Sequence, residues 1–198
     1  MQKINSSFFS CGLFLLSQSA LAQTPMDAHS SNSCLLGQVN QAWVEGAEFV
    51  MGDDSTYREE GPAHAVSVTG FWMDAHEVTN AQFAKFIEET GYITVAEQSP
   101  NPADWPADVP AEYLQPGSVL FVPPLAGQPA DNWWSWVVGT NWRHPDGPDS
   151  NITGRDNYPV IHIAFEDARA YATWAGRSLP TEAQFELAAR NKRDSRYA

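Results

Sequence analysis

The sequence predicts an α+β domain, because segments of two different periodicities follow one another along the chain. Residues 66–73 alternate apolar and polar side chains on either side of a glycine, which is the period of a half-buried strand. Residues 79–91 and 181–190 instead carry apolar side chains at helical spacing behind a Thr-x-x-Gln capping box. A doubly wound parallel sheet is excluded, since the regular βαβ alternation that builds it is missing from the sequence.

Three strand-like segments are expected. The first is the apolar stretch 47–51, which lies between two glycines. The second is the alternating segment 66–73. The third is the short apolar run 160–163 after Pro159, which indicates a buried strand.

The helix expected at 79–91 has the clearest signals. Thr79 opens its capping box, and Gly91 ends it as a residue that accepts a left-handed conformation. Phe83, Phe86 and Ile87 fall on one face, which we expect to be buried.

Two further helices are expected toward the end of the chain. Glu166 and Asp167 suit a first turn, because carboxylates are favoured at a helix N-terminus, and Gly176 ends this helix. Thr181 opens the other helix, whose buried side includes Phe185.

Between these regular parts lies a proline-rich segment, residues 93–140. It holds eight of the fourteen prolines, which excludes continuous helix or central strand over most of its length. Around the end of this segment, four tryptophans lie within ten residues: Trp133, Trp134, Trp136 and Trp142. The simpler interpretation of these tryptophans is a cluster in the core. The more specific interpretation is a groove that binds an extended peptide or a sugar ring.

Charge excludes one class of partner. The 198 residues include 24 Asp plus Glu against 11 Lys plus Arg, for a net charge of -13. Such a surface repels phosphate backbones, so no nucleic-acid partner is expected, and an anionic membrane surface is disfavoured for the same reason.

The N-terminal region has the pattern of a secretory signal peptide. Lys3 is followed by a short apolar run and by an Ala-Leu-Ala cleavage signal that ends at Ala22. We therefore expect a signal peptide at 1–22, a flexible leader at 23–41 and a domain at 42–198. The mature protein would be exported to the periplasm or secreted, would have no membrane partner after signal removal, and would keep Cys34 as its single cysteine.

No catalytic centre or metal site follows from the residues alone. His76-Glu77 lacks the second histidine of a metalloprotease motif, so each histidine is interpreted as a hydrogen-bonded or surface imidazole. The oxygen-rich segment 146–151 departs from the calcium-loop pattern and is more simply explained as a turn. Asn151 opens an N-glycosylation sequon, which matters only in a host with that machinery.

Several blocks together resemble the formylglycine-generating enzyme (sulfatase-modifying factor) family. They are GAEFVMG at 46–52, FWMDAHEVTN at 71–80, NWRHPDGPDS at 141–150 and the stretch 159–186, which ends in GRSLPTEAQFE. The resemblance runs from about Trp43 to Arg190 and is specific as a combination.

This resemblance implies a compact α+β fold of low regularity, related to C-type lectins. It also implies an oxidase that uses O2 and a copper ion held by two cysteines. Its substrate would be a sulfatase polypeptide, in which the cysteine of a Cys-x-Pro-x-Arg segment becomes Cα-formylglycine. Trp142 is carried over as a substrate-binding residue that faces a cleft.

The resemblance also implies copper ligands and structural calcium ligands in the C-terminal half of the family domain. That half would follow the block ending near Arg190, so those ligands are expected to lie outside this chain. Residues 42–198 are therefore expected to be the N-terminal part of a sulfatase-modifying factor domain, incomplete at its C-terminal end and inactive alone.

Two other classes of function stay open. The protein could be a non-catalytic exported binding module of the same fold, which uses its Trp-rich surface for a peptide or glycan. It could also resemble the sulfoxide synthases, which use a non-haem iron. Those enzymes commonly carry an additional N-terminal helical domain with iron-binding histidines, and the residues before Trp43 do not fit one.

Overall fold

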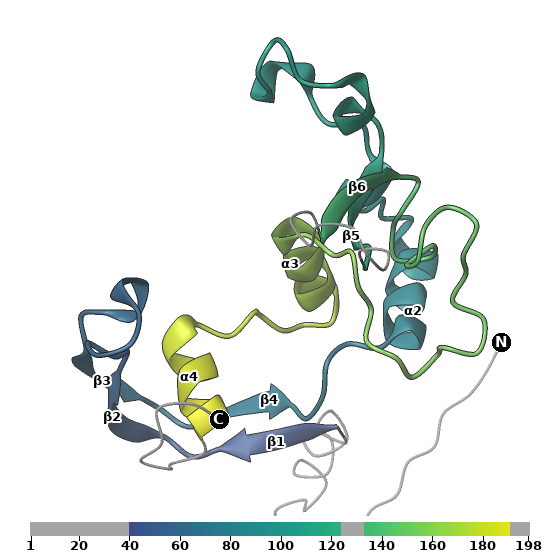
Figure 1. Cartoon of the computed structure of the whole chain (residues 1–198). Coiled ribbons are helices and arrows are strands. Elements are labelled where there is room, and N and C mark those ends of the chain that lie inside the picture. Colours follow the sequence, from purple (N-terminus) through teal and green to yellow (C-terminus); the bar gives the residue numbers. More distant parts are fainter. Residues whose placement is uncertain (1–39, 124–132, 191–198) are drawn as a thin grey trace, which may run out of the picture. The chain divides into compact units, whose positions relative to one another are not determined.

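The computed structural model describes residues 40–123 and 133–190 (Figure 1). Within them lie six short strands, three helices and four single-turn 3-10 helices. The strands are β1 (Gln41–Val44), β2 (Ala47–Met51), β3 (His64–Val68), β4 (Phe71–Asp74), β5 (Gly117–Phe121) and β6 (Trp134–Val138). The helices are α2 (Asn80–Thr90), α3 (Phe165–Trp174) and α4 (Glu182–Arg190), and the 3-10 turns are η2 (Arg58–Glu60), η3 (Val95–Glu97), η4 (Pro102–Asp104) and η5 (Ala111–Leu114). This mixed α+β architecture of low regularity confirms the expected fold class.

The strands form three separate antiparallel ribbons of two strands each. β1 pairs with β4, β2 with β3, and β5 with β6. The expected strand at 47–51 is confirmed as β2. The expected strand at 66–73 is instead split into β3 and β4 at Gly70, where a Cβ atom would lie 2.4 Å from the Trp43 ring.

The expected strand at 160–163 is wrong. Pro159 makes one isolated bridge to Thr79, and Val160 donates one backbone hydrogen bond to Val78. His162 then takes a φ of 60°, a left-handed conformation that ends any extended run. An apolar run alone therefore did not distinguish a buried strand from an irregular, partly exposed segment.

Several helix boundaries lie where local chemistry predicts. The Thr79 hydroxyl accepts from the Gln82 amide, while the Gln82 side chain accepts from the Thr79 amide, and Gly91 closes α2 at φ 65°. At the end of α3, Gly176 takes a φ of 69° and lets the chain turn toward α4. Each boundary depends on side chains a few residues apart, so it was readable from sequence.

An aromatic core holds α2 against α3. Its buried residues are Phe83, Phe86, Ile87 and Trp142. Phe83 stacks on Tyr171 of α3 with the ring centroids 5.9 Å apart. Such pairs stabilise a core by about 0.5–1.5 kcal/mol beyond their area burial, so they fix how the two helices pack.

The N-terminal expectations lie almost wholly outside the described residues. The signal peptide at 1–22, Cys34 and most of the expected leader precede residue 40, and β1 already begins at Gln41, the last residue of that leader. Across the described ranges, no helix is long and apolar enough to cross a membrane.

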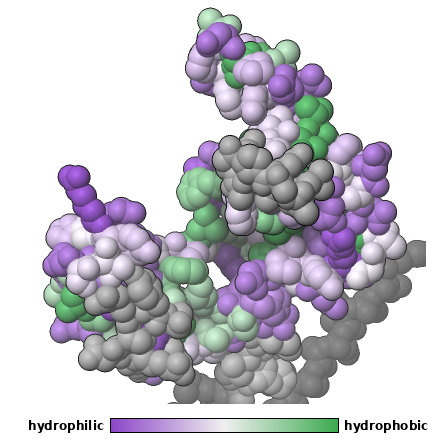
Figure 2. Space-filling model, viewed as in Figure 1, coloured by the Kyte–Doolittle hydropathy of each residue, from purple (hydrophilic) through white to green (hydrophobic). Residues whose placement is uncertain are grey.

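Large apolar side chains are exposed on several elements. Trp43, Trp72, Phe165 and Phe185 are each more than 40% exposed, and hydrophobic residues are visible at several places on the face shown in Figure 2. Contiguous patches above a few hundred Å² usually mark surfaces that another polypeptide covers.

We therefore expect the purified chain to self-associate or to enhance strongly the fluorescence of a hydrophobic dye such as anilinonaphthalene sulfonate. The physical reason is that exposed apolar area is favourably covered either by the dye or by another copy of the chain. Sedimentation and dye titration measure both effects. A dye-silent monomer with cooperative, reversible melting would contradict this expectation.

Candidate functional site

The loop that the resemblance singles out, residues 141–150, has a well-defined geometry. It follows β6 and opens with a tight turn, in which Asn141 and His144 exchange backbone hydrogen bonds of 3.0 and 3.4 Å. The Asn141 side chain accepts from the Arg143 amide at 2.9 Å and donates to the Gly139 carbonyl at 3.2 Å. An asparagine at this position therefore forms the turn from its own side chain.

The second half of the loop is closed by Ser150. Its hydroxyl donates to the Gly147 carbonyl and accepts from the Asp146 amide, at 2.7 and 2.9 Å. Its carbonyl accepts from Nδ1 of His144 at 2.6 Å, so the imidazole carries its proton on that nitrogen. Gly147, at φ 108°, supplies a conformation that L side chains rarely adopt. This geometry is consistent with the turn predicted at 146–151.

Trp142 lies inside the core, which differs from the expectation that its ring faces a cleft. The side chain is 3% exposed, and its ring packs edge-on against Phe83 with the centroids 5.3 Å apart. The turn at Asn141–His144 directs the ring toward α2, although its sequence neighbours are polar. The orientation was therefore predicted wrongly, whereas the role of Trp142 in substrate binding stays a prediction.

Arg143 connects this loop to η3. Its guanidinium carbon lies 4.2 Å from the centroid of the Trp142 ring, and its Nη1 lies 2.5 Å from Oε1 of Glu97. The other oxygen of Glu97 accepts from the amide and the hydroxyl of Thr94. Arg143 is thus held between an aromatic face and a carboxylate that is itself fixed.

His162 holds the same loop from a different segment. Its Nε2 donates to the Pro145 carbonyl at 2.9 Å, because a carbonyl oxygen can only accept. Nδ1 is then left to accept from the Ser118 hydroxyl of β5, 3.0 Å away. Both His144 and His162 are thus hydrogen-bonded imidazoles, as the sequence suggested.

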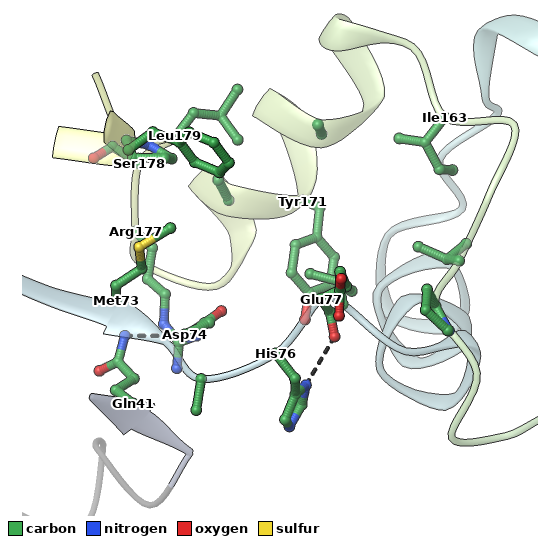
Figure 3. A pocket seen from close by; sticks show the side chains of 18 of the residues that line it. Gln41, Met73, Asp74, His76, Glu77, Ile163, Tyr171, Arg177, Ser178 and Leu179 are labelled. Atoms are coloured by element: carbon green, nitrogen blue, oxygen red, sulfur yellow. Dashed lines mark hydrogen bonds and ion pairs between the residues drawn. The ribbon is translucent and has the colours of Figure 1, made fainter. Parts of the chain in front are cut away.

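A groove of about 960 Å³ opens beside the core. Figure 3 shows Tyr171 extending from α3 toward it, with Met73 and Asp74 of β4 on another side. Arg177 pairs with Asp74, which also accepts from the Gln41 side chain at 3.1 Å. This groove was not predicted from the sequence, although the block at 71–80 and the stretch 159–186 supply most of its lining.

Tyr171 illustrates the character of the groove wall. Burial raises the pKa of its hydroxyl above the ordinary value of 10.0, although nearby Arg177 acts in the opposite direction. The hydroxyl therefore stays protonated at neutral pH, and the ring acts as an apolar surface.

The described residues do not supply the metals that the resemblance implies. Across 40–123 and 133–190, no group of three or more His, Cys, Asp or Glu side chains could hold a metal ion. Copper prefers thiolates in its reduced state, and both cysteines, Cys11 and Cys34, lie outside these ranges. The described residues thus offer no side-chain cluster that fits copper or calcium.

Capped helices, two-stranded ribbons and a turn-rich loop make the described part of the chain an α+β domain of low regularity. The chain belongs to the family described as the sulfatase-modifying factor enzyme 1-like domain, which matches residues 30–198. This finding confirms the resemblance drawn from the sequence blocks.

Individual proteins show which members of the family this chain is similar to. The chain is 49% identical to the formylglycine-generating enzyme of Mycobacterium tuberculosis over 160 residues, which cover 78% of this chain and 52% of the relative. It is 44% identical to the mouse formylglycine-generating enzyme, over 74% of this chain and 38% of the relative. It is also 36% identical to a bovine protein named inactive C-alpha-formylglycine-generating enzyme 2, over 77% and 49%. The chain thus spans about half, or less, of the length of these relatives.

Proposed function

We propose that this chain is the N-terminal part of a formylglycine-generating oxidase, which converts the cysteine of a sulfatase Cys-x-Pro-x-Arg segment to Cα-formylglycine with O2. The observation that carries the proposal is the 49% identity to a relative named formylglycine-generating enzyme. The copper and calcium ions would be held by residues outside this chain. We also propose that the protein is exported, to the periplasm or beyond, through the signal-like sequence at 1–22.

The role proposed for this chain's own residues is to position the substrate peptide. The loop at 141–150 is held at Pro145 by His162 and at Arg143 by Glu97, so its backbone is pre-organised. Pre-organisation lowers the ordering cost of binding an extended peptide. The buried ring of Trp142 would act chiefly by packing against the guanidinium of Arg143. A direct contact with the peptide would require the ring to move.

The first test compares the activity of the chain alone with that of a chimera. We expect the 198-residue chain, incubated with copper, O2 and a Cys-x-Pro-x-Arg peptide, to produce no aldehyde by mass spectrometry, because its described residues offer no thiol pair to bind Cu(I). A chimera, in which residues 43–190 replace the matching segment of the Mycobacterium tuberculosis relative, is expected to produce the aldehyde. The unmodified relative serves as the positive control. Turnover by the chain alone, or a folded chimera without turnover, would contradict the proposal.

A second candidate function rests on the β5–β6 ribbon. One face of this ribbon carries Val119, Phe121 and Trp134, which are 47%, 44% and 61% exposed. The rings of Phe121 and Trp134 meet edge-on with their centroids 5.3 Å apart. Exposed aromatic pairs of this kind suit a non-catalytic module that binds a peptide or glycan.

The two candidates differ in what Trp134→Ala would change. In a binding module, this substitution would weaken capture of a peptide or glycan by the 198-residue chain, and the chimera would be inactive even without the substitution. In the oxidase, the chimera would turn over, and a glycan array would give no Trp134-dependent signal.

A further inference from the structure

Aromatic side chains line one face of the β5–β6 ribbon. Trp134 and Trp136 lie two residues apart in β6, so both side chains point to the same side of the ribbon. Phe121 of β5 is directly opposite Trp134, and Val119 is directly opposite Trp136. Trp136 is partly buried, whereas the other three side chains are exposed, so this face is open to solvent.

The same aromatic surface continues onto residues 98–116, the segment that precedes β5. The Tyr113 ring of η5 contacts the Trp136 ring with the centroids 6.0 Å apart, and Trp105 stacks on Tyr113 at 6.3 Å. Trp105 is 38% exposed, so this end of the surface is also in contact with solvent. We call the whole surface the aromatic row, and its rings are Trp105, Tyr113, Phe121, Trp134 and Trp136.

Segment 98–116 also carries negative charge that is not compensated. Its three acidic side chains, Asp104, Asp108 and Glu112, are all exposed. Among the described residues, no hydrogen bond or ion pair engages these three carboxylates. The sequence has no Lys, Arg or His between Lys85 and Arg143. The carboxylates that border the aromatic row are therefore free to interact with cations of another molecule.

Exposed rings beside free carboxylates fit a cationic partner. The faces of Trp and Tyr rings attract Lys and Arg side chains, and carboxylates add complementary charge. A chain of sugar rings fits less well, because Tyr113 and Trp136 meet at 47°, and Phe121 and Trp134 at 66°, so these rings form no flat platform. The row joins rings from β5, β6 and segment 98–116, which suits an extended ligand better than a single ion.

We infer that the aromatic row docks an extended polypeptide segment that carries Lys or Arg side chains. The inference rests on the second candidate function only in its use of the same ribbon, and it narrows the partner to a cationic polypeptide. It holds equally for an oxidase, because docking on this surface requires no turnover.

Peptide binding tests the inference. An alternating Gly-Arg decapeptide with a fluorescein label would be titrated with the 198-residue chain and followed by fluorescence anisotropy. An alternating Gly-Gln decapeptide and a decaproline are the neutral controls. We expect saturable binding of the Gly-Arg peptide alone, with an affinity that falls as the salt concentration rises, because salt screens exposed charges. The chimera, which contains the row within a full-length family domain, is expected to bind in the same way.

Two sets of charge substitutions locate the contact on this acidic protein. Each set removes three negative charges from exposed positions, so both change the net charge equally. We expect the first set to weaken binding about tenfold or more, and the second to have little effect, because exposed ion pairs act only at short range. The first set is Asp104→Asn, Asp108→Asn and Glu112→Gln, and the second is Glu45→Gln, Glu48→Gln and Glu59→Gln.

A pair of tryptophan substitutions tests the rings. Trp105→Ala removes an aromatic face from the row, and we expect it to weaken binding about threefold or more. Trp72→Ala removes the same side chain from a position outside the row that is 43% exposed, and it should have little effect. Far-ultraviolet circular dichroism of each variant verifies that it is folded.

Other results would overturn the inference. Equal weakening by both charge sets would show general attraction to an acidic protein, and equal binding of a neutral peptide would show that cations are not selected. Trp105-dependent signals on a glycan array without Gly-Arg binding would identify a glycan as the partner. Loss of binding in the chimera would show that the row is covered in a full-length domain. A chimera that binds the Gly-Arg peptide but forms no aldehyde would count against the oxidase proposal alone.

Discussion

Trp142→Ala is expected to lower the free energy of unfolding by about 3–5 kcal/mol, the usual loss when a large aromatic side chain is removed from a core. The indole is 3% exposed, meets Phe83 edge-on and lies beneath the Arg143 guanidinium. Its removal would leave a cavity between α2 and the loop at 141–150, and it would release Arg143 from one of its two supports. Urea unfolding followed by far-ultraviolet circular dichroism measures the loss.

Two controls separate packing from a role in peptide binding. Trp134→Ala removes the same side chain from a position that is 61% exposed, and we expect a change within about 0.5 kcal/mol there. Trp142→Phe keeps much of the ring and should recover part of the lost stability. If Trp142→Ala leaves stability unchanged but weakens peptide binding by the chimera, the ring contacts substrate and its buried position does not describe the working enzyme.

Helices were predictable from the sequence because their boundaries are local. The capping boxes at Thr79 and Thr181 and the glycine at 91 act over three or four residues, and all three recur in the structure. The run at 160–163 failed for the opposite reason. Its conformation is set by His162, whose partners Pro145 and Ser118 are 17 and 44 residues away along the chain.

The site was predictable in part. The turn at 146–151 could be predicted, because a Pro-Asp-Gly sequence has a local signature, whereas the role of the block at 141–150 in substrate binding stays a prediction. The direction of the Trp142 ring was not readable, since it depends on Phe83, which is distant in sequence. The groove was missed for a similar reason, because its lining joins β4, α3 and α4, and no periodicity reveals how these elements meet.

The sequence alone does not indicate how much Asp167 contributes to stability. It was predicted only as a favourable charge in the first turn of a helix. In the structure Asp167 is 0% exposed, and its carboxylate joins the stretch 92–95 to the N-terminus of α3. Oδ1 accepts from the Tyr92 hydroxyl and from the Val95 amide, both at 3.0 Å, and Oδ2 accepts from the Ala164 amide at 2.8 Å.

The Tyr92 hydroxyl reports on this arrangement. Burial, and then its hydrogen bond to the Asp167 carboxylate, raise the pKa of Tyr92 above the ordinary value of 10.0. Since the folded pKa lies above the unfolded one, this contribution to stability is fully present below pH 10.0 and is lost as the pH rises through the folded pKa.

Asp167→Ala is expected to lower the free energy of unfolding by about 3–5 kcal/mol, because it leaves up to three donors without an acceptor and each orphaned donor costs about 1–3 kcal/mol. Glu166→Ala is the matched control, since it removes an exposed carboxylate from the same helix turn and should cost less than about 1 kcal/mol. Tyr92→Phe removes one of the three donors and should cost about 1 kcal/mol. Urea titration of all three variants gives the order, with Asp167→Ala expected to be by far the least stable. Equal losses for the Asp167 and Glu166 variants would show that helix charge, and not the buried acceptor, accounts for the effect of this residue.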